Sequence, residues 1–144
     1  MNTDISLDRD DVAPQIEQLG HGATCEWLFD RQMIVMTAQD STRGSVDTWV
    51  DKCIDIANKW PANRPFCIVV DASNPSLSRT PYMRDRLKGL RTVRTDLSWY
   101  VAMVAPKSYL MQLMSYGLRV MQSNRETRIF FEREEAVQWL KSKL

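Results

Sequence analysis

Four of the five basic side chains between residues 79 and 91 have the types and the spacing of a binding surface. Arg84, Lys88 and Arg91 stand at positions i, i+4 and i+7, which places them on one side of a helix. Arg79 lies just before them, and Asp85 is the only acid in this segment. Such a row of cations can dock an acidic partner or a phosphate. A solvated helix face is the commoner explanation of a single charge run, so both interpretations stay open.

Three hydroxyl groups in the preceding loop could carry regulation: Ser76, Ser78 and Thr80. Thr80 followed by Pro81 is a strong helix start, because a threonine oxygen can cap free N–H groups and proline fits the first helical position. That helix start is an anion site in principle, although simple capping explains it as well. The loop is not rich in glycine, so a nucleotide site is not expected.

The sequence carries few residues or motifs that indicate catalysis or metal binding. The sequence contains neither G-x-S-x-G nor H-E-x-x-H, and the single histidine, His21, leaves few general bases. Asp47, Asp51 and Asp55 recur at helical spacing, but a solvated acidic face explains them better than a metal site without convergent ligands. Asp71 closes a strand, where α/β proteins place active groups, and a turn-forming role is the simpler explanation. We therefore expect no catalytic residue, metal or cofactor, and the sequence favours a non-enzymatic protein.

A segment from Pro106 to about Gln122 is predicted as a helix that is apolar around well over half of its circumference. Glycine in the middle of a helix costs about 1 kcal/mol relative to alanine, so Gly117 indicates a close approach. A helix this apolar is either wedged in the core or covered by a second copy or a ligand. The residues of this possible pocket or dimer face are Met111, Met114, Gly117 and Leu118.

The remaining patterns supply the elements that must position these residues. Apolar runs at 24–29 and 32–38 predict a hairpin, and the helix that follows is expected to begin with Ser45 as its cap. Continuous apolar stretches at 66–70 and 99–105 are typical of buried parallel strands. The chain closes with Thr127–Phe131 and an acidic helix start that leads to Ala136, Val137, Trp139 and Leu140. The order β-β-α-β-α-β-α-β-α predicts an α/β domain with a mostly parallel five-stranded sheet.

The length of 144 residues suits one domain, which we place at residues 23–144. Residues 1–22 are acidic and are expected to form a partly disordered N-terminal extension, with room for a short helix near 13–19. The three cysteines are far apart and lie among apolar neighbours, as reduced thiols of a cytoplasmic protein do. No signal peptide is recognised, and no apolar run approaches the roughly 20 residues that span a membrane.

The net charge of +1 hides an asymmetry between the two halves of the chain. Residues 1–60 carry 11 acids and 5 bases, a balance of −6, whereas residues 61–144 carry 7 acids and 14 bases, a balance of +7. Chains with such a dipole often associate with charged partners. The basic segment lacks interleaved aromatic residues and nucleic-acid motifs, so we do not expect nucleic-acid binding.

Three stretches together resemble the SpoIIAA-like (STAS) superfamily: the opening hairpin, the strand Ile68-Val69-Val70-Asp71-Ala72-Ser73, and the closing Phe131-Glu132-x-x-Glu135-Ala136-x-x-Trp139-Leu140. The resemblance covers roughly residues 23–144 and implies the SpoIIAA-like fold. Anti-sigma-factor antagonists of that superfamily carry an Asp-Ser-Ser-Gly turn with a phosphorylated serine. Here the loop reads Asn74-Pro75-Ser76-Leu77-Ser78-Arg79-Thr80-Pro81, so no one hydroxyl is assigned that role.

Two functions follow as expectations. The first is a STAS-like protein-interaction or regulatory module that acts without catalysis. The second is a carrier or enzyme for a small apolar, lipid-like ligand, with a pocket near the third helix. The surplus apolar surface of that helix also predicts a homodimer.

Overall fold

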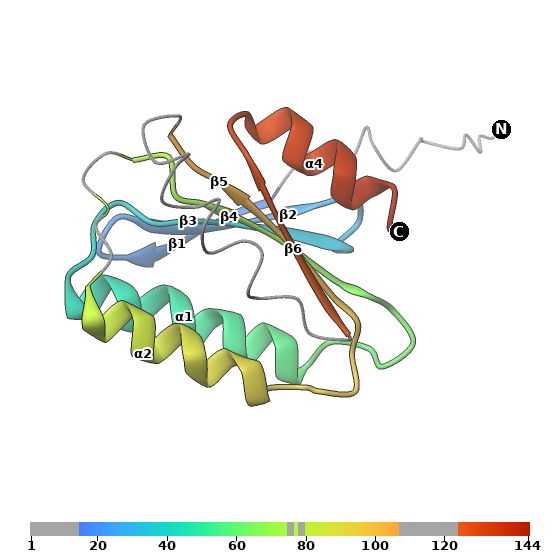
Figure 1. The fold of residues 1–144 in the computed structure, drawn as a ribbon, viewed down its shortest axis with the longest axis horizontal. Coiled ribbons are helices and arrows are strands. Elements are labelled where there is room, and N and C mark those ends of the chain that lie inside the picture. Colours follow the sequence, from blue (N-terminus) through green and yellow to red (C-terminus); the bar gives the residue numbers. More distant parts are fainter. Residues whose placement is uncertain (1–14, 75–76, 78–79, 107–123) are drawn as a thin grey trace, which may run out of the picture.

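The structure is a computed structural model that describes residues 15–74, 77, 80–106 and 124–144. Its six strands form one mixed sheet in the order β1-β2-β3-β4-β5-β6, and three α-helices pack on it (Figure 1). The α/β class is thus confirmed, whereas the prediction of five strands is wrong, because the sheet has a sixth strand at its N-terminal edge. The strands are β1 Gln15–Gly20, β2 Ala23–Leu28, β3 Met33–Thr37, β4 Phe66–Asp71, β5 Trp99–Val104 and β6 Arg125–Phe130. The helices are α1 Arg43–Asn58, α2 Pro81–Gly89 with the 3₁₀ turn η2 Leu90–Thr92, and α4 Arg133–Lys141.

The additional strand, β1, lies in the segment that was expected to be an extension with a short helix. It pairs antiparallel with β2, and the register joins Glu17 to Cys25. Lys52 of α1 forms an ion pair with Glu17 over 2.9 Å, and Leu19 packs against the core. The expected helix is therefore wrong for these residues, because pairing with β2 satisfies their backbone groups and the tertiary contact overrides a weak local preference.

A tight turn joins β2 to β3, as the hairpin prediction required. Phe29, Asp30 and Arg31 all have positive φ angles, between 53° and 62°. The backbone N–H of Gln32 donates to the carbonyl oxygen of Leu28 over 3.1 Å and closes the turn. β2 and β3 are antiparallel, whereas β3, β4, β5 and β6 are parallel to one another.

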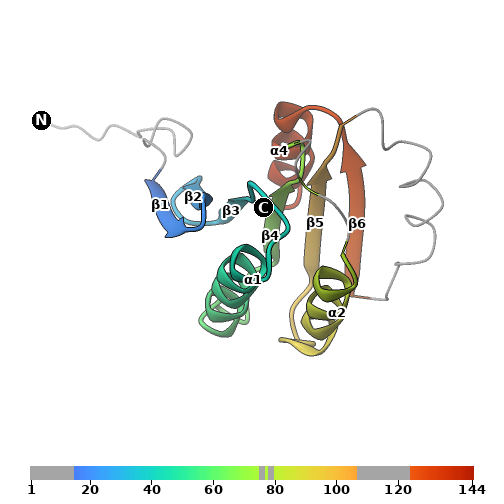
Figure 2. The ribbon, with the colours of Figure 1, turned by 90° about the vertical axis from the view of Figure 1, so that its left-hand side faces the viewer.

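Helices cover both faces of the sheet. Figure 2 shows α1 and α2 on one face and α4 on the other. The first face holds a core built around Trp49, Phe66, Ile68 and Trp99. The second face holds a smaller core, which α4 closes with the fully buried Ala136 and Leu140. Strands buried on both faces explain why β4 reads as an uninterrupted apolar run.

The cap of α1 differs from the prediction. Thr42, not Ser45, is the N-cap residue, and its side-chain oxygen accepts the backbone N–H of Ser45 over 3.3 Å. The hydroxyl of Thr42 donates to Asp40 over 2.7 Å. The carboxylate of Asp40 thus stands at the start of the helix, where the dipole favours negative charge. That hydrogen bond to Thr42 is the main reason that the pKa of Asp40 is lowered.

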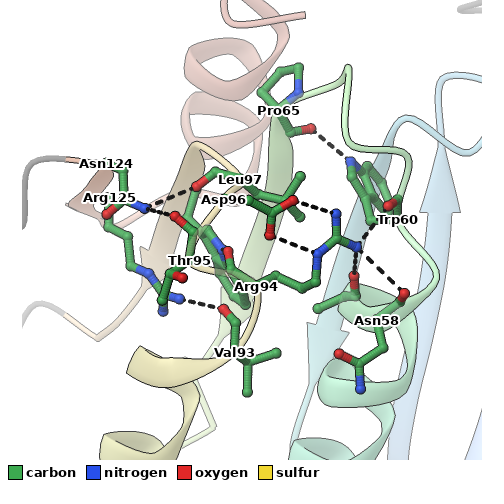
Figure 3. A network of polar contacts seen from close by, with 12 residues as sticks. Asn58, Trp60, Pro65, Val93, Arg94, Thr95, Asp96, Leu97, Asn124 and Arg125 are labelled. Atoms are coloured by element: carbon green, nitrogen blue, oxygen red, sulfur yellow. Dashed lines mark hydrogen bonds and ion pairs between the residues drawn. The ribbon is translucent and has the colours of Figure 1, made fainter.

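Two arginines bind carbonyl groups at the C-terminal ends of the first two helical segments, α1 and α2 with η2 (Figure 3). The guanidinium of Arg94 donates to the carbonyl oxygens of Ala57 and Trp60 at the end of α1, over 2.8 Å each. Arg125 donates to the carbonyl oxygens of Leu90 and Val93 at the end of η2, over 2.8 and 2.6 Å. Cations satisfy the free carbonyl groups of helix C-termini and complement the dipole there. Both contacts fix the helices to the loop before β5 and to β6.

Candidate interaction surface on helix α2

Helix α2 starts as the sequence predicted. Thr80 is the N-cap residue, its side-chain oxygen accepts the backbone N–H of Met83 over 3.1 Å, and Pro81 opens the helix. The hydroxyl oxygen of Thr80 therefore caps the helix. The other two hydroxyls of the prediction, on Ser76 and Ser78, and the guanidinium of Arg79 lie outside the described residues.

One side of α2 is fixed to α1 by polar contacts. The hydroxyl of Tyr82 donates to Asp47, and Arg86 forms an ion pair with Asp51. The Nε of Arg86 also lies 3.7 Å from the carboxylate of Asp47. The expected solvated acidic face of α1 is thus partly wrong, because two of its acids face α2. The hydrogen bond to Asp47 raises the pKa of Tyr82, and the hydrogen bond to Asp51 raises that of Arg86.

Two further cations of α2, Arg84 and Lys88, together with Arg91 of the following turn η2, form what we call the basic face. All three side chains are exposed, as the i, i+4, i+7 spacing predicted. Within the described part of the chain, none of the three has an ion pair, a hydrogen bond or an aromatic ring as partner. Every other lysine and arginine described does have such a partner. The three described cations that lack all three kinds of partner thus lie close together in the sequence, on α2 and η2.

Arg125 adds to the positive field beside the basic face, and sequence reasoning missed it. Its guanidinium lies 4.1 Å from the ring centroid of Trp99, and no carboxylate among the described residues pairs with it. Burial lowers the pKa of Arg125, and the charge of Arg91 lowers it further. A strand pattern could not have revealed this arginine, because its position at the first residue of β6 brings it under η2 only in the folded sheet.

A polar turn follows β4 at the carboxyl edge of the sheet. Asp71 accepts hydrogen bonds from the backbone N–H of Ser73 over 3.1 Å and from its hydroxyl over 2.5 Å. The side-chain amide of Asn74 donates to Gln39 over 2.7 Å. The carboxylate of Asp71 is thus committed to a turn, which confirms the simpler of the two roles considered for it. Ser73 is an exposed hydroxyl that the sequence analysis did not single out.

Other candidate sites of the sequence analysis fall elsewhere. Met111, Met114, Gly117 and Leu118, together with the rest of the predicted third helix beyond Pro106, lie outside the described residues. The ring of His21 lies against α1, where a Cβ on Gly44 would come within 2.7 Å of its Cε1. Across the described ranges, no group of three or more His, Cys, Asp or Glu side chains is placed to hold a metal ion.

The sequence analysis also expected no membrane-spanning segment and buried, reduced cysteines. No described helix is long and apolar enough to cross a membrane. Cys25, Cys53 and Cys67 are all buried and free of disulfides. Burial raises the pKa of Cys25 to about 11 and that of Cys67 to about 12, and it raises the pKa of Cys53 as well. These thiols are built as core side chains and not as nucleophiles.

Comparison of the chain with protein-family models, with curated proteins and with solved structures found no match. The basic face is therefore interpreted on its own geometry.

Proposed function

We propose that this protein is a non-enzymatic, STAS-like interaction module that binds an acidic protein partner through the basic face of α2. One observation carries the proposal: Arg84 and Lys88 on α2 and Arg91 on η2 are exposed and have no ion pair, hydrogen bond or aromatic partner among the described residues, whereas every other described lysine and arginine has at least one of these contacts. Exposed charges pay no desolvation free energy in the unbound protein. Their field attracts an acidic partner towards the helix at long range.

The opposite side of α2 makes the surface suitable for docking. Tyr82 and Arg86 bind the acids of α1, and Met83 is buried in the core. These contacts hold the helix in one rotational setting, so the three cations keep a fixed spacing towards solvent. The backbone that carries the three cations thus loses little conformational freedom when a partner binds, whereas their side chains still lose rotamer freedom.

The STAS-like assignment rests on the sequence resemblance, and the order of elements agrees with it. The hairpin β2–β3 precedes three parallel strands, and helices α1 and α2 cross over between neighbouring strands. A module of this kind would act by binding, which fits the structural roles of Asp71 in a turn, Asp40 at a helix cap and Asp51 in an ion pair, and the burial of the three cysteines.

A charge-reversal experiment tests the proposal. The triple variant Arg84→Glu, Lys88→Glu and Arg91→Glu should lose an acidic partner that wild type captures from its native host and binds again as a purified protein. Folding should be nearly unaffected, because exposed charges matter individually by only about 0–1 kcal/mol. Binding of wild type should weaken as salt rises, since the Debye length is already only about 8 Å at physiological ionic strength.

A matched control reverses two exposed cations away from α2, Lys59 and Arg128. Both have acidic neighbours, Asp55 and Glu126, and neither lies on the basic face. The control variant should keep the partner. Equal binding by wild type and the triple variant would refute the proposed function.

A further inference from the structure

Three exposed carboxylates at the start of α4 have no cation beside them. They belong to Glu132, Glu134 and Glu135, which we call the acidic corner. None of the three has a side-chain ion pair or hydrogen bond among the described residues. Only two other described side-chain carboxylates lack both kinds of contact, those of Asp30 and Asp85, and each lies on a different element. All the remaining ones have a cation or a hydrogen-bond donor.

The acidic corner is the counterpart of the basic face in charge and in number. The basic face holds three cations without a partner, and the acidic corner holds three anions in the same condition. The helix dipole stabilises glutamates in a first turn, but it leaves their full charges facing solvent. Both surfaces are therefore available for a contact outside the molecule, and their charges are complementary.

One molecule cannot bring its own two surfaces together. α2 and α4 lie on opposite faces of the sheet (Figure 2). α4 follows β6, so the acidic corner lies at the end where the parallel strands end. α2 runs from the end of β4 back towards the start of β5, so Lys88 and Arg91 lie at the opposite end. The length of a six-residue strand, about 20 Å, and the thickness of the sheet thus separate the two surfaces.

Three other arginines also lack a carboxylate partner, and they differ from the basic face in two ways. The guanidinium groups of Arg31, Arg43 and Arg64 each lie over an aromatic ring, at 3.9, 4.7 and 5.4 Å from its centroid. They also come from three separate parts of the chain, the β2–β3 turn, α1 and the loop before β4. The basic face, by contrast, is one continuous stretch of helix and turn. The three stacked arginines therefore serve as the comparison set in the test below.

We infer that the acidic partner of the basic face is a second copy of this chain, which presents its acidic corner. This inference rests on the proposed function, because it names the partner of that surface. The contact joins two different surfaces, so it is head to tail, and each added copy leaves one surface free at either end. The expected product is an open row of copies and not a closed pair. Exposed ion pairs are individually weak, so the association is reversible and needs a high protein concentration.

Sedimentation velocity of the full chain tests the inference. At about 50 mM sodium chloride, where exposed charges are weakly screened, wild type should sediment faster as its concentration rises to about 0.5 mM. This rise should vanish at about 1 M salt, where the Debye length is about 3 Å. A rise that persists at high salt would come from an apolar contact and would count against the two charged surfaces.

Two neutralising variants remove one surface each. The cation variant carries Arg84→Gln, Lys88→Gln and Arg91→Gln, and the glutamate variant carries Glu132→Gln, Glu134→Gln and Glu135→Gln. Neither variant should self-associate at low salt, because each has lost one half of the contact. An equimolar mixture should associate but stop at pairs. The acidic corner of the cation variant meets the basic face of the glutamate variant, and no further complementary surface remains.

Two matched controls change the same number of charges elsewhere. Asp30→Asn, Asp55→Asn and Glu126→Gln remove three acids away from the start of α4, as the glutamate variant removes three there. Arg31→Gln, Arg43→Gln and Arg64→Gln remove three cations away from the basic face. Both controls should self-associate like wild type.

A labelled decaglutamate peptide separates the inference from the proposed function, because it probes the basic face without a second copy. Wild type that binds the peptide through the basic face but does not self-associate would overturn the inference and leave the proposed function intact. A mixture of the two neutralising variants that stays unassociated would also overturn it, as would a control that loses association as fully as they do. Peptide binding that is unchanged in the cation variant would instead refute the basic face as a binding surface.

Discussion

The guanidinium of Arg94 donates a hydrogen bond to the carbonyl oxygen of Trp60 over 2.8 Å. The contact links the loop before β5 to the end of α1, at a separation of 34 residues. The same guanidinium nitrogen donates to Ala57, and the other side of the fork binds Asp96 (Figure 3). One side chain thus satisfies the end of a helix that has no other basic residue in its last turn.

Replacement of Arg94 by alanine should therefore destabilise the fold by about 2–3 kcal/mol, because it leaves partly buried carbonyl groups without donors. Urea denaturation followed by tryptophan fluorescence measures the loss. Arg94→Lys should recover part of the stability, since an ammonium keeps the charge but lacks the forked geometry. A loss below about 0.5 kcal/mol for the alanine variant would show that water replaces the guanidinium at no cost.

Thr80→Ala should cost about 1 kcal/mol, the usual value of an N-cap side chain. Thr80→Ser should keep most of that stability, because serine offers the same acceptor to the N–H of Met83. Thermal unfolding of the two variants beside wild type makes the comparison. If both variants have the same melting temperature as wild type, the hydroxyl of Thr80 does not cap α2.

Leu140→Ala should be more damaging than Trp139→Ala. Leu140 is fully buried, and its truncation should cost about 3 kcal/mol. Trp139 is partly exposed and contacts Tyr100 and Phe130 at ring distances of 6.2 and 5.8 Å, so its loss should cost about 2 kcal/mol. Chemical denaturation gives both values, and the reverse order would mean that α4 docks mainly through its tryptophan.

Removal of residues 1–20 should lower the melting temperature by more than about 5 °C, because it deletes β1 and exposes the edge of β2. Sequence reasoning alone predicts that this truncation is harmless. The matched control begins at Gln15 and keeps β1 with its contact between Glu17 and Lys52. Calorimetry distinguishes the two expectations, and equal melting temperatures for both truncated chains would show that β1 contributes nothing.

Stability should decline as the pH rises from about 9 to 11. Burial raises the pKa of Cys25 from 9.0 to about 11, so the native state holds a proton that the unfolded state releases. The stability from this thiol is complete below the unfolded pKa and is lost as the pH rises through the folded pKa. Cys25→Ala should show a flatter decline in urea melts over this range. A variant with the same slope as wild type would assign the decline to other groups.

The sequence predicted what depends on local pattern. The uninterrupted apolar run at β4, the hairpin and the Thr80-Pro81 helix start are all present, because burial and capping leave a signature in neighbouring residues. The exposure of Arg84 and Lys88 on α2 also followed from helical spacing alone, whereas Arg91 lies on the 3₁₀ turn that follows.

The sequence could not predict what depends on distant partners. β1 has five exposed residues out of six, so its pattern carries no alternation, and only pairing with β2 makes it a strand. Thr42 and Ser45 are both acceptable caps by type, and the choice depends on Asp40 beside the first. The role of Arg125 depends on η2, which lies more than thirty residues earlier in the chain.

The order of the strands in the sheet is also their order in the chain, and this has a consequence for how the protein folds. Each new strand adds to an edge that already exists, so none of the described strands has to insert between two earlier ones. Because consecutive strands pair, no described pairing has to close a loop longer than one crossover connection. A chain emerging from the ribosome can extend this sheet strand by strand, and each addition covers the edge left open by the last.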